Sequence, residues 1–302
     1  MIDTRAYLER IHYTGPLRND YETLRQLSLA HLNSVPMETM DIHLGVPLVL
    51  NVDYLYRKIV VRHRGGYCYE LNGLFAELLR ALGFQVDLLS ARVTRPGGHV
   101  GPEFDHATLR VTIDGTAYMA DVGFGDGFAE PMEMVPGARR QVHGRDFRLV
   151  ERAGELHFEV HDEDGFDKGC ILSLVPRRLE EFQAQSDAHC SNPRSWFVRT
   201  RLATMATPAG RKTLMNDVLK IHEGDRTTVI GIRNKEHFAQ VLRDHFGLRL
   251  SRVPRAKGER LSMRLRCQTM VWQHRAHKLC DLALQAAGDA AQLLGQKKAR
   301  VS

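Results

Sequence analysis

The stretch RHRGGYCYELNGLF, residues 62–75, places one cysteine two residues after a glycine pair, at the start of a strongly patterned segment. The spacing predicts a helix that begins near Cys68, and Gly83 is placed to end it. Gly65-Gly66 permits a sharp turn into this helix. The apolar stripe that carries this prediction consists of Leu71, Leu74, Phe75, Leu78, Leu79 and Leu82.

Cys68 has two interpretations. At a helix N-terminus, free backbone N–H groups and the helix dipole favour a thiolate and lower its pKa. Alternatively, Cys68 only packs, since cysteine is among the most buried residue types and this one lies three residues before Leu71, on the same face. The helix alone leaves both interpretations open, so a nucleophile requires a base from elsewhere in the chain.

A candidate base and its partner lie in HATLRVTIDGTAYMADV, residues 106–122. An Asp-Gly pair between two alternating segments is a strong signal for a two-residue hairpin turn. In that register His106 and Asp121 are diagonal neighbours on one face, close enough for an imidazole and a carboxylate to meet. If the Cys68 helix docks on this face, a Cys-His-Asp triad results. A solvent-facing histidine beside an incidental aspartate, or a shifted register, are the alternatives.

The rest of the chain divides by pattern. Residues 1–84 show mainly helical spacing, and residues 85–190 consist of short alternating runs separated by glycine-containing turns, which indicates a β domain. Residues 191–251 mix elements, including a helix over 235–246 with Asn234 as N-cap and Gly247 as its stop. We therefore expect an α+β protein.

Composition excludes several classes. The 302 residues contain no apolar run of about 18 residues, so no membrane span is expected. The N-terminal residues MIDTRAYLERIHY lack the apolar core of a signal peptide, which favours a cytoplasmic location. The five cysteines show no CxxC spacing, which argues against a disulfide framework and against a metal site.

The net charge of +6 belongs to the C-terminal tail. Residues 252–302 carry eleven Lys or Arg and three acids, whereas residues 1–251 carry 31 bases and 33 acids. The tail also holds an Ala/Leu stripe between 279 and 294, which predicts one weakly amphipathic helix. A basic tail is more often a solvated appendage than a nucleic-acid or membrane contact, so neither partner is expected.

Three motifs, RGGYCYELNGLF, DHATLRV and ADVGFGDG, resemble those of the arylamine N-acetyltransferases, and the resemblance covers roughly residues 1–250. It implies a helical bundle, a central β-barrel domain and an α/β lid, within the papain-like cysteine-triad superfamily. It also implies that Cys68, His106 and Asp121 form the triad. By the same resemblance, Phe124 lines the arylamine pocket, and Arg64 pairs with Glu38 to brace the cysteine turn.

The resemblance further implies a ping-pong reaction in which acetyl-CoA acetylates Cys68 and an arylamine or hydrazine then takes the acetyl group. The loop TRPGGHVGPEF, residues 94–104, with Gly97 and Gly98 and with Arg92 or Arg95, is a weak candidate for coenzyme contacts, because it matches no phosphate-binding pattern. Other possibilities are a papain-like or transglutaminase-like hydrolase, an amide synthase with a larger acyl chain, and a basic-tailed binding protein. The sequence does not indicate an oligomeric state.

Overall fold

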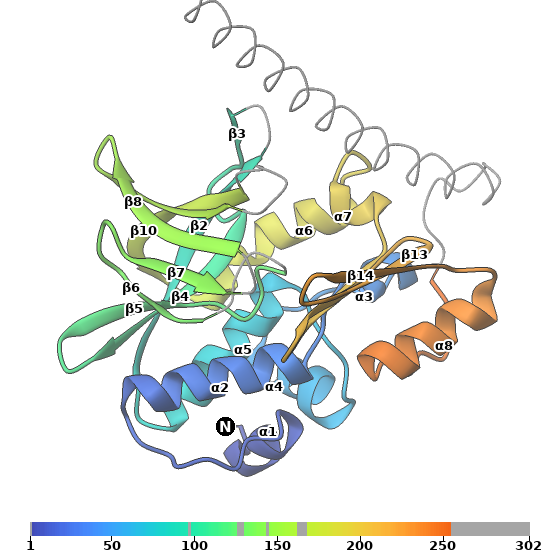
Figure 1. Cartoon of the computed structure of the whole chain (residues 1–302), viewed down its shortest axis with the longest axis horizontal. Coiled ribbons are helices and arrows are strands. Elements are labelled where there is room, and N and C mark those ends of the chain that lie inside the picture. The colour runs from blue at the N-terminus through green and yellow to red at the C-terminus, as the bar shows by residue number, and fades with distance from the viewer. Residues whose placement is uncertain (1, 96–97, 126–129, 143–144, 162–167, 255–302) are drawn as a thin grey trace, which may run out of the picture. The chain divides into compact units, whose positions relative to one another are not determined.

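The computed structural model describes residues 2–95, 98–125, 130–142, 145–161 and 168–254. In this part of the chain, N-terminal helices, a nine-stranded sheet and a five-stranded sheet follow one another (Figure 1). The helices are α1 (Thr4–Arg10), α2 (Tyr21–Ser34), α3 (Met40–Leu44), α4 (Val52–Tyr56), the π-helix η1 (Arg57–Val61), α5 (Cys68–Ala81), the 3-10 helix η3 (Leu179–Phe182), α6 (Gln183–Ser191), α7 (Trp196–Arg199) and α8 (Lys235–Phe246). The strands are β1 (Met37–Glu38), β2 (Gln85–Arg95), β3 (His99–Val100), β4 (His106–Ile113), β5 (Thr116–Ala120), β6 (Met132–Glu133), β7 (Arg139–Val142), β8 (Arg145–Arg152), β9 (Glu155–His161), β10 (Lys168–Arg177), β11 (Leu202–Thr207), β12 (Gly210–Met215), β13 (Val218–Glu223) and β14 (Arg226–Gly231).

Helix α5 is the central element of the larger core, and its predicted position is confirmed. It begins at Cys68, and the left-handed Gly83 follows its last turn with φ +93°. The apolar stripe is buried, with Leu71, Leu74 and Leu78 fully inaccessible to solvent. One side of α5 packs against β2 and β4, and the other packs against α1 and α4 (Figure 1). Cys68 therefore begins a helix whose apolar stripe is buried in the core.

The hairpin of β4 and β5 also has the predicted register. Asp114 and Gly115 both have positive φ, 48° and 81°, as a two-residue type I′ turn requires. Ile113 pairs with Thr116, and Leu109 pairs with Ala120. One face of the hairpin contributes Leu109 and Ala120 to the core around α5. The other face, which carries Met119, belongs to a second core.

This second core shows that the nine-stranded sheet is rolled into a barrel. The strand order is β6-β5-β4-β2-β10-β9-β8-β7, with β3 paired to β2. Met119 of β5 and Phe147 of β8 lie near opposite ends of this order, yet they pack in one cluster with Phe158 and Cys170. Side chains from distant strands can share a core in this way only if the sheet curls back on itself. The expected β-barrel is confirmed.

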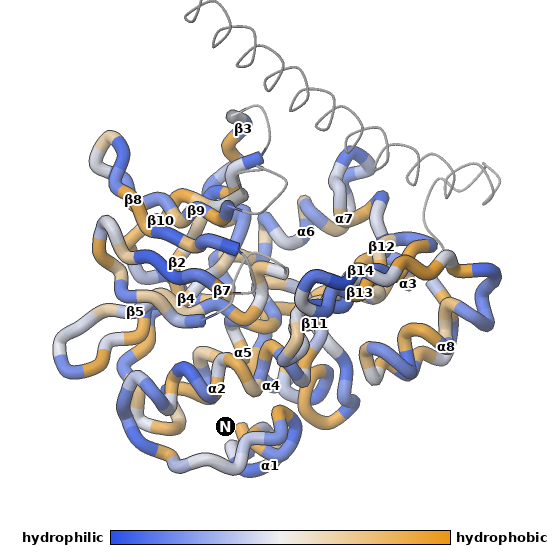
Figure 2. The backbone as a smooth tube through the Cα atoms, in the orientation of Figure 1, coloured by the Kyte–Doolittle hydropathy of each residue, from blue (hydrophilic) through white to orange (hydrophobic). Residues whose placement is uncertain are grey.

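The five-stranded sheet has the order β1-β11-β12-β13-β14 and is covered by α8. The bounds and caps predicted for α8 are confirmed, because the Asn234 side chain accepts the first-turn N–H of His237 and Gly247 is left-handed with φ +68°. Hydrophobic and hydrophilic residues alternate along α8 (Figure 2), and Phe238 and Leu242 are buried against the sheet. Strand β1 was not predicted, since two residues carry no readable period.

The described residues do not decide every prediction made from the sequence. The boundaries at residues 84, 190 and 251 stay predictions. The tail helix expected between 279 and 294 lies outside the described residues, as does the basic tail from residue 255 on. Among the helices of the described ranges, none is long and apolar enough to cross a membrane.

His31 predicts a specific loss of stability in acid. Its ring is fully buried, 5.2 Å from the ring of Phe75 between centroids, and neither ring nitrogen has a hydrogen-bond partner among the described residues. Burial, and then the charge of Arg10, lower the pKa of His31 from 6.5 to about 3. Between these two pKa values His31 binds a proton in the unfolded chain but not in the folded chain. Its contribution to the free energy of unfolding is therefore complete above pH 6.5 and falls as the pH drops from 6.5 toward 3.

We expect wild-type protein to lose about 2 kcal/mol of unfolding free energy through His31 between about pH 7.5 and about pH 5.0. Urea denaturation at the two pH values measures this loss, and His31→Met should lack that part of it. The same pH dependence in both proteins would contradict the assignment to His31.

Candidate active site

The turn before Cys68 requires its glycines. A Cβ atom on Gly65 would lie 2.1 Å from the carbonyl oxygen of Pro36, which no side chain can approach so closely. The carbonyl of Gly66 accepts the backbone N–H of Glu38 at 2.7 Å. The glycine pair thus lets the segment leading to Cys68 run directly against residues 36–38.

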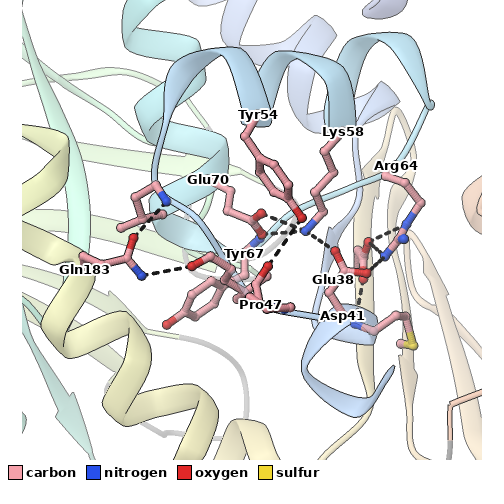
Figure 3. Close-up of polar contacts among 12 residues, drawn as sticks. Glu38, Asp41, Pro47, Tyr54, Lys58, Arg64, Tyr67, Glu70 and Gln183 are labelled. Atoms are coloured by element: carbon pink, nitrogen blue, oxygen red, sulfur yellow. Dashed lines mark hydrogen bonds and ion pairs between the residues drawn. The ribbon is translucent and has the colours of Figure 1, made fainter. Parts of the chain in front are cut away.

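A buried network of charges braces the same turn (Figure 3). Arg64 Nη2 donates to Glu38 Oε1 at 2.6 Å and to Asp41 Oδ1 at 2.8 Å. Lys58 Nζ lies 2.8 Å from Asp41 Oδ2 and donates to both oxygens of Glu70, at 2.8 and 2.9 Å. The ion pair between Arg64 and Glu38, implied by the resemblance, is present. Lys58 and Asp41 were missed, because nothing in the sequence distinguishes a buried lysine from an exposed one.

The network reaches the first turn of α5 through Glu70. One oxygen of this carboxylate also accepts the backbone N–H of Tyr67 at 3.0 Å, which caps the helix directly before Cys68. Burial raises the pKa of Glu70, and Lys58 opposes this effect. Burial alone would lower the pKa of Lys58, but Glu70 and the other carboxylates raise it above its usual value. Lys58 is therefore a permanently charged partner inside the protein.

Cys68 is buried, with 4% of its surface exposed, at the N-terminus of α5. Burial and the negative charge of Asp121 raise the pKa of its thiol, whereas hydrogen bonds from the backbone N–H groups of Ala107 and Tyr69 lower it. The helix terminus thus lowers this pKa, as its backbone donors suggest, but burial outweighs them and the net effect is an increase. A thiolate at this position needs a base that takes the proton and remains beside it as a cation.

His106 and Asp121 form the predicted pair. His106 Nε2 lies 2.6 Å from Asp121 Oδ2, and both side chains are buried. Asp121 Oδ1 accepts two further hydrogen bonds, from Asn72 Nδ2 and from the N–H of Gly123, each at 2.8 Å. Such a carboxylate fixes the tautomer and orientation of the ring and leaves Nδ1 for proton exchange.

Asn72 was not identified from the sequence. Its Nδ2 also donates to the carbonyl of Ala107 at 2.7 Å, and its Oδ1 accepts the N–H of Val122 at 2.9 Å. It follows Cys68 by four residues and therefore lies on the same side of α5. The available signal was a polar amide at i+4 from the cysteine, inside an otherwise apolar helix. Asn72 therefore joins α5 to β4, which begins at His106, and to the segment that carries Asp121.

Gly123 and Phe124, which closely follow Asp121, complete the contact of this segment with α5 and with His106. A Cβ atom on Gly123 would lie 2.8 Å from the Cα of Cys68, so this position must be glycine for α5 to dock. The ring of Phe124 packs edge-on against His106 with centroids 4.7 Å apart, and against Phe158 of the barrel core at 6.1 Å. Phe124 therefore separates the histidine from the interior of the barrel.

The weak coenzyme candidates are less well supported. Gly97 lies outside the described residues, and Gly98 is exposed with φ +77°. Arg92 pairs with Glu155, and Arg95 Nη2 lies 2.8 Å from Asp105 Oδ2, so carboxylates already engage both arginines. Within the described ranges, no group of three or more His, Cys, Asp or Glu is arranged to hold a metal ion.

Comparison with known proteins gives the family of this chain. A family model described as N-acetyltransferase matches residues 20–254. A pineal gland isozyme of arylamine N-acetyltransferase from Gallus gallus is 30% identical over 277 residues, which cover 83% of this chain and 96% of that protein. The chain belongs to the arylamine N-acetyltransferase family. Another member, from Mycolicibacterium smegmatis, is 30% identical over 255 residues, covering 82% of this chain and 93% of its own length.

Solved structures of the family extend the agreement to the fold. The arylamine N-acetyltransferase of Mycobacterium marinum has a TM-score of 0.76 and 32% identity, covering 81% of this chain and 92% of that one. A structure of the M. marinum protein in complex with CoA has a TM-score of 0.75 and 32% identity, with the same coverage of both chains. The predicted succession of helical bundle, barrel and α/β lid is thus the fold of this family.

We expect Lys58→Met to lower the free energy of unfolding by about 3–5 kcal/mol, because it leaves Glu70 buried without its cation and leaves Asp41 with Arg64 alone. Urea denaturation measures the change. Arg5→Ala is the matched control: Arg5 pairs with Glu9 at 3.0 Å, but its side chain is 89% exposed, so no change is expected.

The double variant Lys58→Met/Glu70→Gln should recover part of the loss, because the amide oxygen still accepts the Tyr67 N–H while one buried negative charge is removed. Wild-type stability of Lys58→Met would show that the network does not hold the turn.

Proposed function

We propose that the protein transfers an acetyl group from acetyl-CoA to arylamines, arylhydrazines or N-arylhydroxylamines through an acetyl-Cys68 intermediate. The observation that carries the proposal is the buried 2.6 Å contact between His106 and Asp121, located where the N-terminus of α5 presents Cys68. Membership of the family, and the CoA complex of its M. marinum member, support the same donor.

In the first half-reaction, the Cys68 thiol gives its proton to His106 Nδ1, and the sulfur attacks the thioester carbonyl of acetyl-CoA. The bond between the carbonyl carbon and the coenzyme sulfur breaks, and the leaving thiolate takes the proton from the imidazolium. The products are acetyl-Cys68 and CoA.

In the second half-reaction, the amine nitrogen attacks the acetyl carbon and transfers a proton to His106. The bond to the Cys68 sulfur breaks, and the imidazolium returns the proton to that sulfur, so the enzyme ends in its starting state. Asp121 keeps the ring in one tautomer throughout. We assign the apolar acceptor contact to Phe124, whose ring lies against His106.

Family membership weakens the alternatives. A hydrolase or a transglutaminase-like enzyme uses the same triad, but the relatives named above are acetyltransferases. The substrates that we propose are small molecules. Cys68, Cys170 and Cys190, the cysteines that the structure describes, are free thiols, which supports our proposal that the enzyme acts in the reducing cytoplasm.

Incubation with acetyl-CoA in the absence of an amine should leave one acetyl group on Cys68, detected by intact mass and located by peptide mapping. Addition of an aniline or a hydrazine should remove it and release the acetylated amine. Cys68→Ala should carry no acetyl group. Normal turnover by Cys68→Ala would refute the mechanism, and loss of the acetyl group to water at the same rate with or without amine would favour a hydrolase.

Asp121→Asn should fold, since the new amide oxygen can still accept the hydrogen bonds from Asn72 and Gly123. It should acetylate Cys68 about 100-fold or more slowly, because the amide does not stabilise the imidazolium. Single-turnover acetylation, with circular dichroism to confirm folding, measures the effect. A wild-type rate would remove Asp121 from the mechanism.

A further inference from the structure

Tyr69 links the helix that begins at Cys68 to the two residues that directly precede His106. It directly follows Cys68 in α5, and its side chain is fully buried. Its hydroxyl donates to the carbonyl of Phe104 at 2.5 Å and lies 3.1 Å from the carbonyl of Asp105. These two residues immediately precede His106. One side chain therefore spans from the start of the nucleophile helix to the segment that delivers the base.

The segment that Tyr69 holds is strained. Phe104 has φ +62°, a left-handed conformation that an aromatic residue rarely adopts. Such a conformation persists only where the surroundings fix it. Its N–H donates to Ser90 Oγ on β2 at 2.8 Å, and its carbonyl accepts from Tyr69. These two polar contacts hold the strained peptide units on either side of the residue.

Apolar contacts keep the Tyr69 ring in place but do not replace its hydroxyl. The ring packs against Phe182, with centroids 5.4 Å apart, and edge-on against Tyr67 at 5.0 Å. The side chain of Asp105 is anchored separately, by Arg95 at 2.8 Å and by His189 at 3.0 Å. Those contacts fix the carboxylate of Asp105, whereas the Tyr69 hydroxyl contacts the backbone that leads into His106.

We propose that Tyr69 is a positioning residue: its hydroxyl holds the strained backbone of Phe104 and Asp105 and thereby sets the distance between Cys68 and His106. The proposal rests on the proposed function for its catalytic consequence. Burial raises the pKa of Tyr69 well above its usual value, so the hydroxyl remains a donor over the working pH range. Without it, two carbonyls lose their donor and the backbone before His106 is free to relax.

Tyr69→Phe removes only the hydroxyl and keeps the packed ring. We expect single-turnover acetylation of Cys68 to slow by about 10- to 100-fold, the range that a small misplacement of reacting groups produces. Tyr7→Phe is the matched control, because Tyr7 is equally buried and its hydroxyl has no hydrogen-bond partner among the described residues. Its acetylation rate should equal that of wild type.

A second readout separates positioning from mere stability. The rate of Cys68 alkylation by iodoacetamide as a function of pH reports the thiolate, whose charged surroundings include Asp121 and Asp105. A looser contact with His106 should move this profile to higher pH in Tyr69→Phe and leave it unchanged in Tyr7→Phe. Thermal melting establishes that both variants are folded.

The outcomes are distinct. A wild-type alkylation profile in Tyr69→Phe, with or without a lower melting temperature, would overturn the positioning role, and so would an unchanged acetylation rate. Alkylation does not depend on acetyl-CoA, so it tests Tyr69 even if wild-type protein fails to take an acetyl group. That failure would refute the proposed function alone.

Discussion

The side-chain amide of Asn72 fixes how α5, the helix that begins at Cys68, meets the strand that begins at His106. Its nitrogen donates to Ala107 and Asp121, and its oxygen accepts from Val122. A buried amide whose donors and acceptor are paired is costly to disrupt, because each lost bond leaves a desolvated polar group. These hydrogen bonds therefore fix the position of α5 against the barrel. They also fix Cys68, which lies one turn earlier in the same helix.

Burial and nearby carboxylates oppose an isolated thiolate at Cys68. The network beside it contains two cations, Lys58 and Arg64, and three carboxylates, and Asp121 adds a further negative charge that raises the thiol pKa. An isolated thiolate is costly in such surroundings. In the mechanism that we propose, the thiolate is therefore stabilised by the imidazolium of His106, so a motion that separates the sulfur from the ring would remove this stabilisation.

Much of the local structure was predictable because local rules determine it. The stripe from Leu71 to Leu82 predicts α5, the pair Asp114-Gly115 predicts the turn and register of the β4–β5 hairpin, and Asn234 and Gly247 predict both ends of α8. The hairpin register predicted that His106 and Asp121 could meet, and the structure shows the contact. The pairing of β1 with β11 did not, because it joins residues far apart in sequence without a periodic signal.

By itself, the sequence determined the helix that begins at Cys68, the hairpin that brings His106 to Asp121, and, through its motifs, the family. Only the tertiary structure decided that the helix end docks on that hairpin, that Lys58 is buried among carboxylates, and that the thiol pKa is raised rather than lowered. The reason is physical. Periodicity and turn chemistry act over a few residues, whereas burial, desolvation and the satisfaction of polar groups such as Asn72 depend on which distant segments come together.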